Sequence, residues 1–383
     1  MSENLSPEQV KDFIKRGFSR RHLGRITSVL AAGAALPFYN ESALAQLSML
    51  NGPMPADAVK INANENPLGP CAEAAEAIYG VVKKGGRYMY EETFSFAKTL
   101  ADVEGVKPNY VLPFAGSSDP LHRAVLAFTS PAKPLIMGDP GYEAGQRAAE
   151  FVGAKVIRVP LQKDFSHDVK AMAKADPNAG LIYICNPNNP TGTITKRSDI
   201  EWLLANKPAG SILLLDEAYV HLSENAVAGS DLVAADKDVL ILRTFSKIYG
   251  MAGLRAGAAI ARPDLLKKIQ PYGAGALPLT GMVGANTSLK VKTLVPERRK
   301  IIADIRNDVF SWMTKKNYSF VPSESNKFMV DVKRPGGEVV QLMAQEKVFI
   351  GRVWPAWPTH VRVSVGTKEE MEKFKVAFAK VMA

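Results

Sequence analysis

The sequence predicts an α/β protein in which a large domain, built on a mainly parallel sheet, is followed by a smaller α/β domain. A chain of 383 residues is longer than the ~250 to 300 residues at which one hydrophobic core stops growing, so we expect two domains. Between residues 110 and 262, short apolar runs alternate with segments of helical length. Continuous apolar strands separated by helices are typical of a parallel sheet covered on both faces.

The large domain is expected over residues 90–290, with its strands at the apolar runs Leu135–Gly138, Lys155–Val159, Leu181–Cys185, Ile212–Asp216, Val239–Arg243 and Gly257–Ala261. The small domain is expected over residues 291–383. There a charged periodic stretch from Pro296 precedes three apolar runs and a closing helix from Lys368; the runs are Lys327–Val332, Val348–Ile350 and Val361–Val365. Residues 46–89 are expected to form an arm that contributes to the small domain, because segment 64–70 has neither a helical nor an alternating period.

The composition is that of an ordinary globular protein. Hydrophobic residues make up 46% and charged residues 22% of the chain, which excludes disordered, collagen-like and coiled-coil classes. The formal net charge is +10, but no run of Lys and Arg reaches five residues and no aromatic-basic RNA-binding motif is present, so no nucleic-acid partner is expected. The two cysteines, Cys71 and Cys185, are expected to be free thiols.

Residues 1–45 predict a twin-arginine signal peptide. The pair Arg20-Arg21 is followed by an apolar segment, residues 26–36, that is too short to span a bilayer, and then by the small-x-small cleavage pattern of residues 43–45. We therefore expect an exported, periplasmic protein without a stable membrane anchor. The alternative is an amphipathic N-terminal helix packed on the body of a cytoplasmic protein.

Polar residues follow the apolar runs at the carboxyl ends of the expected strands, where open α/β sheets bind ligands. Asn189 lies in a proline-rich turn after the run that ends at Cys185, Asp216 and Tyr219 follow the next run, and Lys247 follows the run that ends at Arg243. Each has an ordinary explanation when taken alone: a structural turn, a helix cap or a solvated lysine. Their occurrence together, in this order, favours a shared site.

This set of residues matches the needs of pyridoxal 5′-phosphate. That cofactor needs a lysine for a Schiff base and a carboxylate that keeps its pyridine nitrogen protonated, for which Lys247 and Asp216 are available. It also needs hydrogen-bond donors at its ring hydroxyl and a cationic, hydroxyl-rich cradle for its phosphate. The candidates for these two tasks are Asn189 and Tyr219 for the hydroxyl, and Thr244, Ser246 and Arg255 for the phosphate.

With these motifs the sequence resembles the fold-type I pyridoxal-phosphate aminotransferases of classes I and II, and within them the histidinol-phosphate aminotransferase-like branch, over about residues 60 to 383. The resemblance implies a large domain with a mostly parallel, seven-stranded type of sheet. It also implies that Lys247 forms the Schiff base, with Asp216, Asn189 and Tyr219 around the cofactor ring. Ser117 and Ser118 are implied as further phosphate ligands at a helix start, and Tyr142 as the ring stacked on the cofactor. No metal site is expected.

The resemblance also implies substrate and partner contacts. Arg362 matches the family arginine that binds the substrate carboxylate. Arg352 lies near the place of the arginine that binds substrate phosphate in the histidinol-phosphate branch, and Asn64 is a further candidate for the substrate. Tyr88 resembles a tyrosine that reaches the cofactor phosphate of the other subunit of a homodimer; the proline that commonly follows is replaced by Met89-Tyr90, which leaves Tyr88 and Tyr90 as alternatives.

The sequence therefore predicts an aminotransferase that moves the amino group of an L-amino acid to a 2-oxo acid by ping-pong chemistry. An aromatic or other L-amino acid is favoured over histidinol phosphate for two reasons: segment 353–358 departs from the common pattern, and export would misplace an enzyme of histidine biosynthesis. Histidinol-phosphate aminotransferase and a lyase or decarboxylase with the same cofactor are the alternatives. A non-catalytic binding protein is disfavoured, because the lysine is retained.

Overall fold

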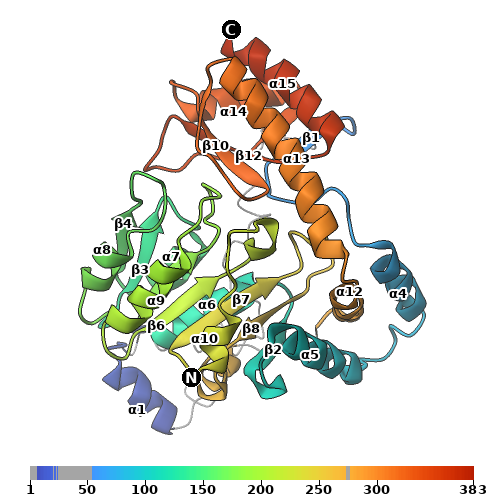
Figure 1. The fold of residues 1–383 in the computed structure, drawn as a ribbon. Helices are drawn as coiled ribbons and strands as arrows, with labels where there is room; N and C mark the ends of the chain where they lie inside the picture. Colours follow the sequence, from blue (N-terminus) through green and yellow to red (C-terminus); the bar gives the residue numbers. More distant parts are fainter. Residues whose placement is uncertain (1–6, 20, 23, 25–53, 273–276) are drawn as a thin grey trace.

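A computed structural model describes residues 7–19, 21–22, 24, 54–272 and 277–383 of the chain. Its centre is a seven-stranded sheet with the order β2-β8-β7-β6-β5-β3-β4 (Figure 1). The strands are β2 (Val111–Phe114), β3 (Leu135–Asp139), β4 (Val156–Pro160), β5 (Leu181–Cys185), β6 (Ile212–Asp216), β7 (Val239–Thr244) and β8 (Gly257–Ile260). All residues of β5, β6, β7 and β8 are buried, which explains their continuous apolar character.

The predicted α/β class and mainly parallel sheet are confirmed, and the six predicted strands of this sheet agree with the structure to within one residue at each end. Two features were not foreseen. β8 runs antiparallel to both of its neighbours, β7 and β2. β2 was missed because it has only four residues and contains Pro113, a residue that sheets tolerate at an edge, and β2 is an edge strand.

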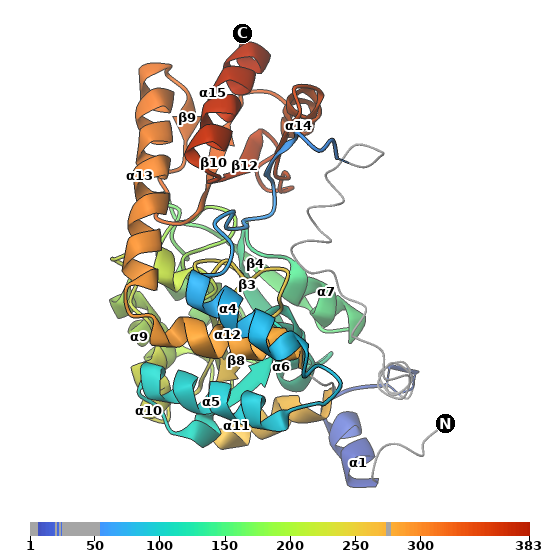
Figure 2. The same ribbon diagram turned by 90° about the vertical axis from the view of Figure 1, so that its right-hand side faces the viewer.

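Helices pack on the central sheet and beside it. Those of the large domain are α5 (Tyr90–Glu104), α6 (Ser118–Phe128), α7 (Ala144–Phe151), α8 (Val169–Lys174), α9 (Arg197–Asn206), α10 (Ser230–Ala234), α11 (Pro263–Ile269) and α12 (Leu279–Lys290). Figure 2 shows α12 between α5 and α4 (Ala72–Val82), and α12 contacts both helices. No helix among the described residues is long and apolar enough to cross a membrane.

The C-terminal part forms a separate layer above the large domain in Figure 1. It consists of α13 (Leu294–Lys315), β9 (Ser319–Phe320), β10 (Lys327–Asp331), α14 (Gly336–Gln345), β11 (Val348–Ile350), β12 (His360–Ser364) and α15 (Lys368–Met382). The strands β12, β10 and β9 form an antiparallel sheet in that order. The closing helix α15 begins with a capping box, in which the Thr367 hydroxyl and the Glu370 carboxylate each accept a backbone N–H of the other residue.

The N-terminal arm links the two domains. Its strand β1 (Val59–Ile61) pairs in parallel with β11 of the small domain, whereas α4 packs on α12. The arm therefore contributes a strand to the small domain and a helix to the surface of the large one. Between these two elements it passes the carboxyl ends of the central strands, where its residues 63 and 65 line a cavity.

The first described helix, α1 (Pro7–Lys15), lies against the body of the protein. Phe13 and Phe18 are buried, and the Arg16 guanidinium donates to the carbonyl oxygens of Leu126, Ala127 and Thr129 at the end of α6, at 2.8 to 3.0 Å. This packing is the arrangement that the alternative to a signal peptide predicts for the first residues. Arg20, the apolar segment and the cleavage pattern lie outside the described residues.

Candidate active site

A cavity of about 270 Å³ opens at the carboxyl ends of β5, β6 and β7. The residues that line it come from the arm, from the start of α6, from the last residues of these three strands and the loops after them, and from the loop after β3; they are Ala63, Glu65, Ser117, Ser118, Tyr142, Cys185, Asn189, Asp216, Ala218, Tyr219, Thr244, Ser246, Lys247, Ala252, Gly253 and Arg255. The cavity thus brings together ten of the residues that the sequence analysis proposed for a cofactor site.

Lys247 and Asp216 are both buried in this cavity. Lys247 follows β7, and its Nζ lies 3.5 Å from the carbonyl oxygen of Ala63. Asp216 is the last residue of β6 and accepts hydrogen bonds from the Tyr183 hydroxyl, at 2.9 Å, and from the backbone N–H of Ala218, at 3.1 Å. Burial raises the pKa of Asp216, and these two hydrogen bonds and the charges of Lys327 and Lys247 oppose that rise.

The hydroxyl groups and the guanidinium expected to hold a phosphate lie next to one another. The Thr244 hydroxyl donates to Ser246 Oγ at 3.0 Å, and Arg255 Nη1 donates to the same oxygen at 3.3 Å. Ser117 and Ser118 lie at the N-terminus of α6, where unpaired backbone N–H groups and the helix dipole favour an anion. These hydroxyl groups, the guanidinium and the helix N-terminus are therefore together suited to bind an anion with several oxygens.

Close backbone approach shapes this part of the cavity. Gly116 has φ +94°, and a Cβ at this position would overlap the Arg255 guanidinium. Arg255 itself has φ +59°, a conformation that costs energy for a residue with a side chain. The strained Arg255 backbone and the missing Gly116 side chain together allow the guanidinium to reach Ser246 and the Ala115 carbonyl oxygen, which it meets at 3.0 Å.

A hydrogen-bonded network connects the cavity to the small domain. Asn64 Nδ2 lies 3.0 Å from the Tyr219 hydroxyl and 3.4 Å from Asn189 Oδ1, which also accepts from Arg362 Nη1 at 2.9 Å. Asn64 also bonds Ser364 of β12 through its backbone N–H and its Oδ1. Arg362 is completely buried, and its Nη2 donates to the Asn62 carbonyl oxygen. The structure thus places Asn64 and Arg362 behind the residues expected to bind the cofactor ring.

Arg352 lies in a different environment. Its Nη1 donates to both carboxylate oxygens of Glu143, at 2.9 and 3.0 Å, and its guanidinium lies 4.6 Å from the centre of the Trp354 ring. The Arg362 guanidinium lies 5.4 Å from the centre of the same ring. Trp354 therefore contacts both arginines, and the charge of Arg352 is balanced by a carboxylate of this chain.

Tyr142, expected to stack on the cofactor, lines the cavity and is buried. Tyr88 does not line the cavity of its own chain. It precedes α5, is 71% exposed, and stacks on Tyr90 with ring centres 5.7 Å apart. In one chain, therefore, neither tyrosine reaches the proposed phosphate site.

Two buried residues near the cavity were not foreseen. Tyr183 lies within the apolar run of β5, where a tyrosine resembles ordinary core; the available signal was its place two residues before the end of a strand that neighbours Asp216. Lys327 opens the apolar run of β10, and its Nζ lies 3.1 Å from the centre of the Tyr219 ring. The signal in the sequence was a lysine directly before the apolar residues of a strand, a position where a charged side chain is unusual.

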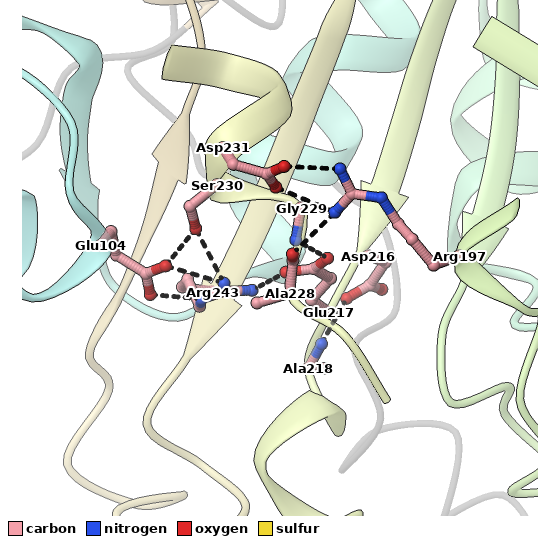
Figure 3. Close-up of polar contacts among 10 residues, drawn as sticks. All are labelled: Glu104, Arg197, Asp216, Glu217, Ala218, Ala228, Gly229, Ser230, Asp231 and Arg243. Carbon is pink, nitrogen blue, oxygen red and sulfur yellow. Dashed lines mark hydrogen bonds and ion pairs between the residues drawn. The ribbon is translucent and has the colours of Figure 1, made fainter. Parts of the chain in front are cut away.

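Behind Asp216, a buried ionic cluster joins β7, α5 and α10 to the residue that follows β6 (Figure 3). Arg243 of β7 is paired with Glu217, which follows Asp216, and with Glu104 at the end of α5, at 2.6 Å from Arg243 Nε. The Ser230 hydroxyl of α10 donates to Glu104. Although burial alone would raise the pKa of Glu104, the charge and hydrogen bonds of Arg243 and the Ser230 hydrogen bond lower it to about 2. The cluster fastens β6, which ends at Asp216, to β7, which Lys247 follows.

Comparisons with known proteins show the family and the fold of the chain. The family model for aminotransferase class I and II matches residues 56–378. A histidinol-phosphate aminotransferase of Moorella thermoacetica is 31% identical over 337 residues, covering 85% of this chain and 86% of the relative. An aromatic amino acid aminotransferase of Cutibacterium acnes is 32% identical over 324 residues, covering 83% and 90%. The structure of a Sinorhizobium meliloti histidinol-phosphate aminotransferase in complex with pyridoxal-5′-phosphate, 24% identical, has the same fold, with a TM-score of 0.80 over 90% of this chain and 95% of that one.

Proposed function

The chain belongs to the aminotransferase class I and II family and is a pyridoxal-phosphate-dependent aminotransferase, and from this premise we propose the roles of its residues and its substrate. The observation that carries the assignment of roles is the joint burial of Lys247 and Asp216 in one cavity, next to the cluster of Thr244, Ser246 and Arg255.

The cavity suits the cofactor at each of its polar ends. Lys247 would hold the aldehyde carbon, Asp216 the ring nitrogen, and Asn189 and Tyr219 the ring hydroxyl. Arg255, with the hydroxyls of Ser117, Ser118, Thr244 and Ser246, would hold the phosphate; a Cβ on Gly116 would overlap the Arg255 guanidinium, so the glycine leaves room for this side chain. Tyr142 would cover one face of the ring.

The residues divide the catalytic work. When bound, pyridoxal phosphate supplies an electron-withdrawing ring that accepts the electron pair left when the Cα proton of the substrate is removed. Asp216 holds the proton on the ring nitrogen, for which its own carboxyl group must be ionised. Lys247 Nζ takes the proton from the substrate Cα. It returns this proton to the former aldehyde carbon of the cofactor, on the other side of the substrate nitrogen. Burial of the site excludes water from these proton transfers.

We propose a substrate of the histidinol-phosphate type, because relatives that carry this name align with most of the chain. The relatives thus favour what the sequence analysis treated as the alternative. An aromatic L-amino acid is the second candidate. Two observations support it: the charge of Arg352 is already balanced by Glu143, which weakens its attraction for a substrate phosphate, and the aromatic ring of Trp354 lies against both Arg352 and Arg362.

The experiment that tests the function is an absorbance spectrum of the purified protein with pyridoxal phosphate, followed after addition of histidinol phosphate or of single L-amino acids without a 2-oxo acid. Conversion of the band to the pyridoxamine form by one compound establishes the first half-reaction and names the donor. A Lys247→Ala variant should bind the cofactor without that band and convert none. A band that no donor converts would favour the lyase alternative, and a wild-type protein with no band would contradict the assignment of Lys247.

We also propose that the enzyme is a homodimer with shared active sites. Large apolar side chains are exposed on α4, on α5 and on the segment between them; they are Tyr79, Val82, Tyr88, Tyr90 and Phe94. Several exposed apolar side chains on neighbouring segments of the chain are typical of a protein interface. A partner chain packed on this segment would cover Tyr88 and Tyr90, and either tyrosine could then serve the cavity of the partner.

Export by the twin-arginine route stays a proposal for residues 1–45. Its support is the order of arginine pair, apolar segment and cleavage pattern. The docked helix α1 supports the alternative of a cytoplasmic enzyme. Fractionation of bacteria that express the full chain decides between them: the wild-type protein should be periplasmic, the double variant Arg20→Lys, Arg21→Lys should stay in the cytoplasm, and Arg25→Lys should behave as the wild type. A cytoplasmic wild-type protein would rule out export.

A further inference from the structure

Lys327 is a second lysine at the active site for which the proposed mechanism has no use. It is the first residue of β10 and is 0% exposed. Its Nζ lies 2.9 Å from Ser325 Oγ and 3.1 Å from the centre of the Tyr219 ring. Lysine is almost never fully buried, because moving its charge out of water is costly. Because this burial is costly and places the Lys327 ammonium against the Tyr219 ring at the cavity, we infer that Lys327 has a function there.

The register of the small sheet directs Lys327 toward the cavity. Lys327 pairs with Ser364, and Met329 pairs with Arg362, in the antiparallel ladder of β10 and β12. Residues directly opposite each other, and those two positions along, share one face of a sheet. Lys327 thus lies on the same face as Ser364 and Arg362, which contact Asn64 and Asn189 at the cavity.

Lys327 is also close to Lys247. The Nζ of Lys247 lies 5.6 Å from the centre of the Tyr219 ring, and that of Lys327 lies 3.1 Å from the same point. The two nitrogens therefore cannot be farther apart than the sum of these distances, 8.7 Å. At such a distance inside a protein, two positive charges repel each other appreciably.

Other ionisable groups reach this part of the site from every side. They are Asp216 at the end of β6, Tyr183 and Cys185 of β5, Tyr142 before α7, Tyr219, Arg255 before β8, Glu65 of the arm and Arg362 of β12. Asp216 is the buried carboxyl group near both lysines, whose charges oppose the rise of its pKa on burial. Arg255 and Arg362 face the positions proposed for anionic groups of the ligands. Lys327 differs from them, because its ammonium is held against the Tyr219 ring instead.

We propose that Lys327 is a positioning residue whose buried charge repels a proton from the Lys247 nitrogen in the holoenzyme, so that this nitrogen can accept the proton of an incoming substrate ammonium group. The proton balance is simple: an N–H bond of the substrate ammonium group breaks, an N–H bond forms at the Lys247 nitrogen, and the substrate amine becomes free to attack. The inference rests on the proposed function, since it concerns Lys247 joined to the cofactor.

The test is a pH titration of the visible absorbance band of the holoenzyme, because the position of this band reports the proton on the Lys247 nitrogen. Loss of one like charge within 8.7 Å should raise the midpoint by about 1 pH unit in Lys327→Met. Lys327→Arg keeps the charge and should stay near the wild-type midpoint. Lys333→Met is the matched control: its side chain is 71% exposed beyond the end of the same strand, and its midpoint should not change.

A raised midpoint in Lys327→Met alone supports the proposal. Equal midpoints in Lys327→Met and the wild type, or equal shifts in Lys327→Met and Lys327→Arg, overturn it and leave the proposed function standing. A wild-type protein that never forms the band overturns both. Should Lys327→Met fail to fold, Lys327→Gln takes its place; a wild-type band that stays protonated into alkaline pH contradicts the proposal without any variant.

Discussion

Asp216 shows, at the scale of single residues, how opposing effects set the state of one group. Burial raises the pKa of its carboxyl group, whereas the hydrogen bonds from Tyr183 and the Ala218 N–H and the nearby lysine charges lower it. The proposed mechanism needs the ionised form. The residues around Asp216 are therefore as important as the carboxylate itself, and Tyr183 is the one whose contribution can be removed with the least disturbance.

Tyr183→Phe should lower kcat about tenfold, because a hydrogen bond to a charged acceptor is worth about 1.5 to 3 kcal/mol. The pKa of Asp216 should rise further. Since activity needs the ionised carboxylate and is lost as the pH falls through that pKa, the acidic limb of the kcat profile should move to higher pH. Tyr110→Phe, which removes a tyrosine bonded to Asp236 outside the cavity, is the control. An acidic limb in the same place in both variants would contradict the role of Tyr183.

The pairing of Glu143 with Arg352 leads to a second prediction, on substrate choice. Glu143→Gln removes the carboxylate charge that balances Arg352, so the KM of a phosphate-bearing substrate should fall about tenfold, as expected for one charge-assisted contact. The KM of an aromatic amino acid should stay the same or rise. Glu150→Gln, on the exposed side of α7, should change neither value. Equal changes for both substrate classes in Glu143→Gln would show that this pair does not select the substrate.

At the scale of elements, the buried cluster of Glu104, Arg243 and Glu217 fastens α5 to β7 and to the end of β6 (Figure 3). The pKa of Glu104 is lowered from 4.5 to about 2, so its ionised form stabilises the folded state. This stability is fully present above the ordinary pKa of the carboxyl group and is lost as the pH falls from about 5 toward 2.

Glu104→Gln should therefore lower the free energy of unfolding by about 3 kcal/mol at pH 7, as the pKa shift implies. The difference from the wild type should shrink as the pH approaches 3, because the wild-type carboxyl group begins to take up its proton. Denaturant unfolding at several pH values measures both effects. Glu201→Gln, in an exposed pair with Arg197, should cost under about 1 kcal/mol. A pH-independent loss in Glu104→Gln would mean that its charge is not the cause.

For the whole molecule, the exposed apolar face of α4 and α5 is the proposed dimer interface. Phe94→Glu places a charge where the side chain is 73% exposed in one chain, and should give monomers in size-exclusion chromatography. If Tyr88 or Tyr90 contributes to the active site of the partner chain, loss of the dimer should also lower the activity. Val376→Glu is the matched control, since Val376 is 74% exposed but lies on α15 of the small domain. A wild-type protein that is monomeric at micromolar concentration would rule out the interface.

The sequence by itself determined the elements whose signal is local. Strands such as β5 and β6 are continuous apolar runs because both faces of the sheet are covered, and this needs no knowledge of their neighbours. The polar residues that end these runs were found for the same reason, since parallel strands bring their carboxyl ends to one edge. Asp216 and Lys247 could therefore be predicted to share a site.

Only the tertiary structure decided what depends on pairing between distant segments. The antiparallel direction of β8, the addition of β1 to β11 and the contact of Lys327 with Tyr219 join residues far apart in the chain. The ion pair of Arg352 with Glu143 is of the same kind, and it changes what this arginine can bind. Such contacts arise when the domains pack together, because strand partners and buried charge partners are chosen by the geometry of the whole fold and leave no local period in the sequence.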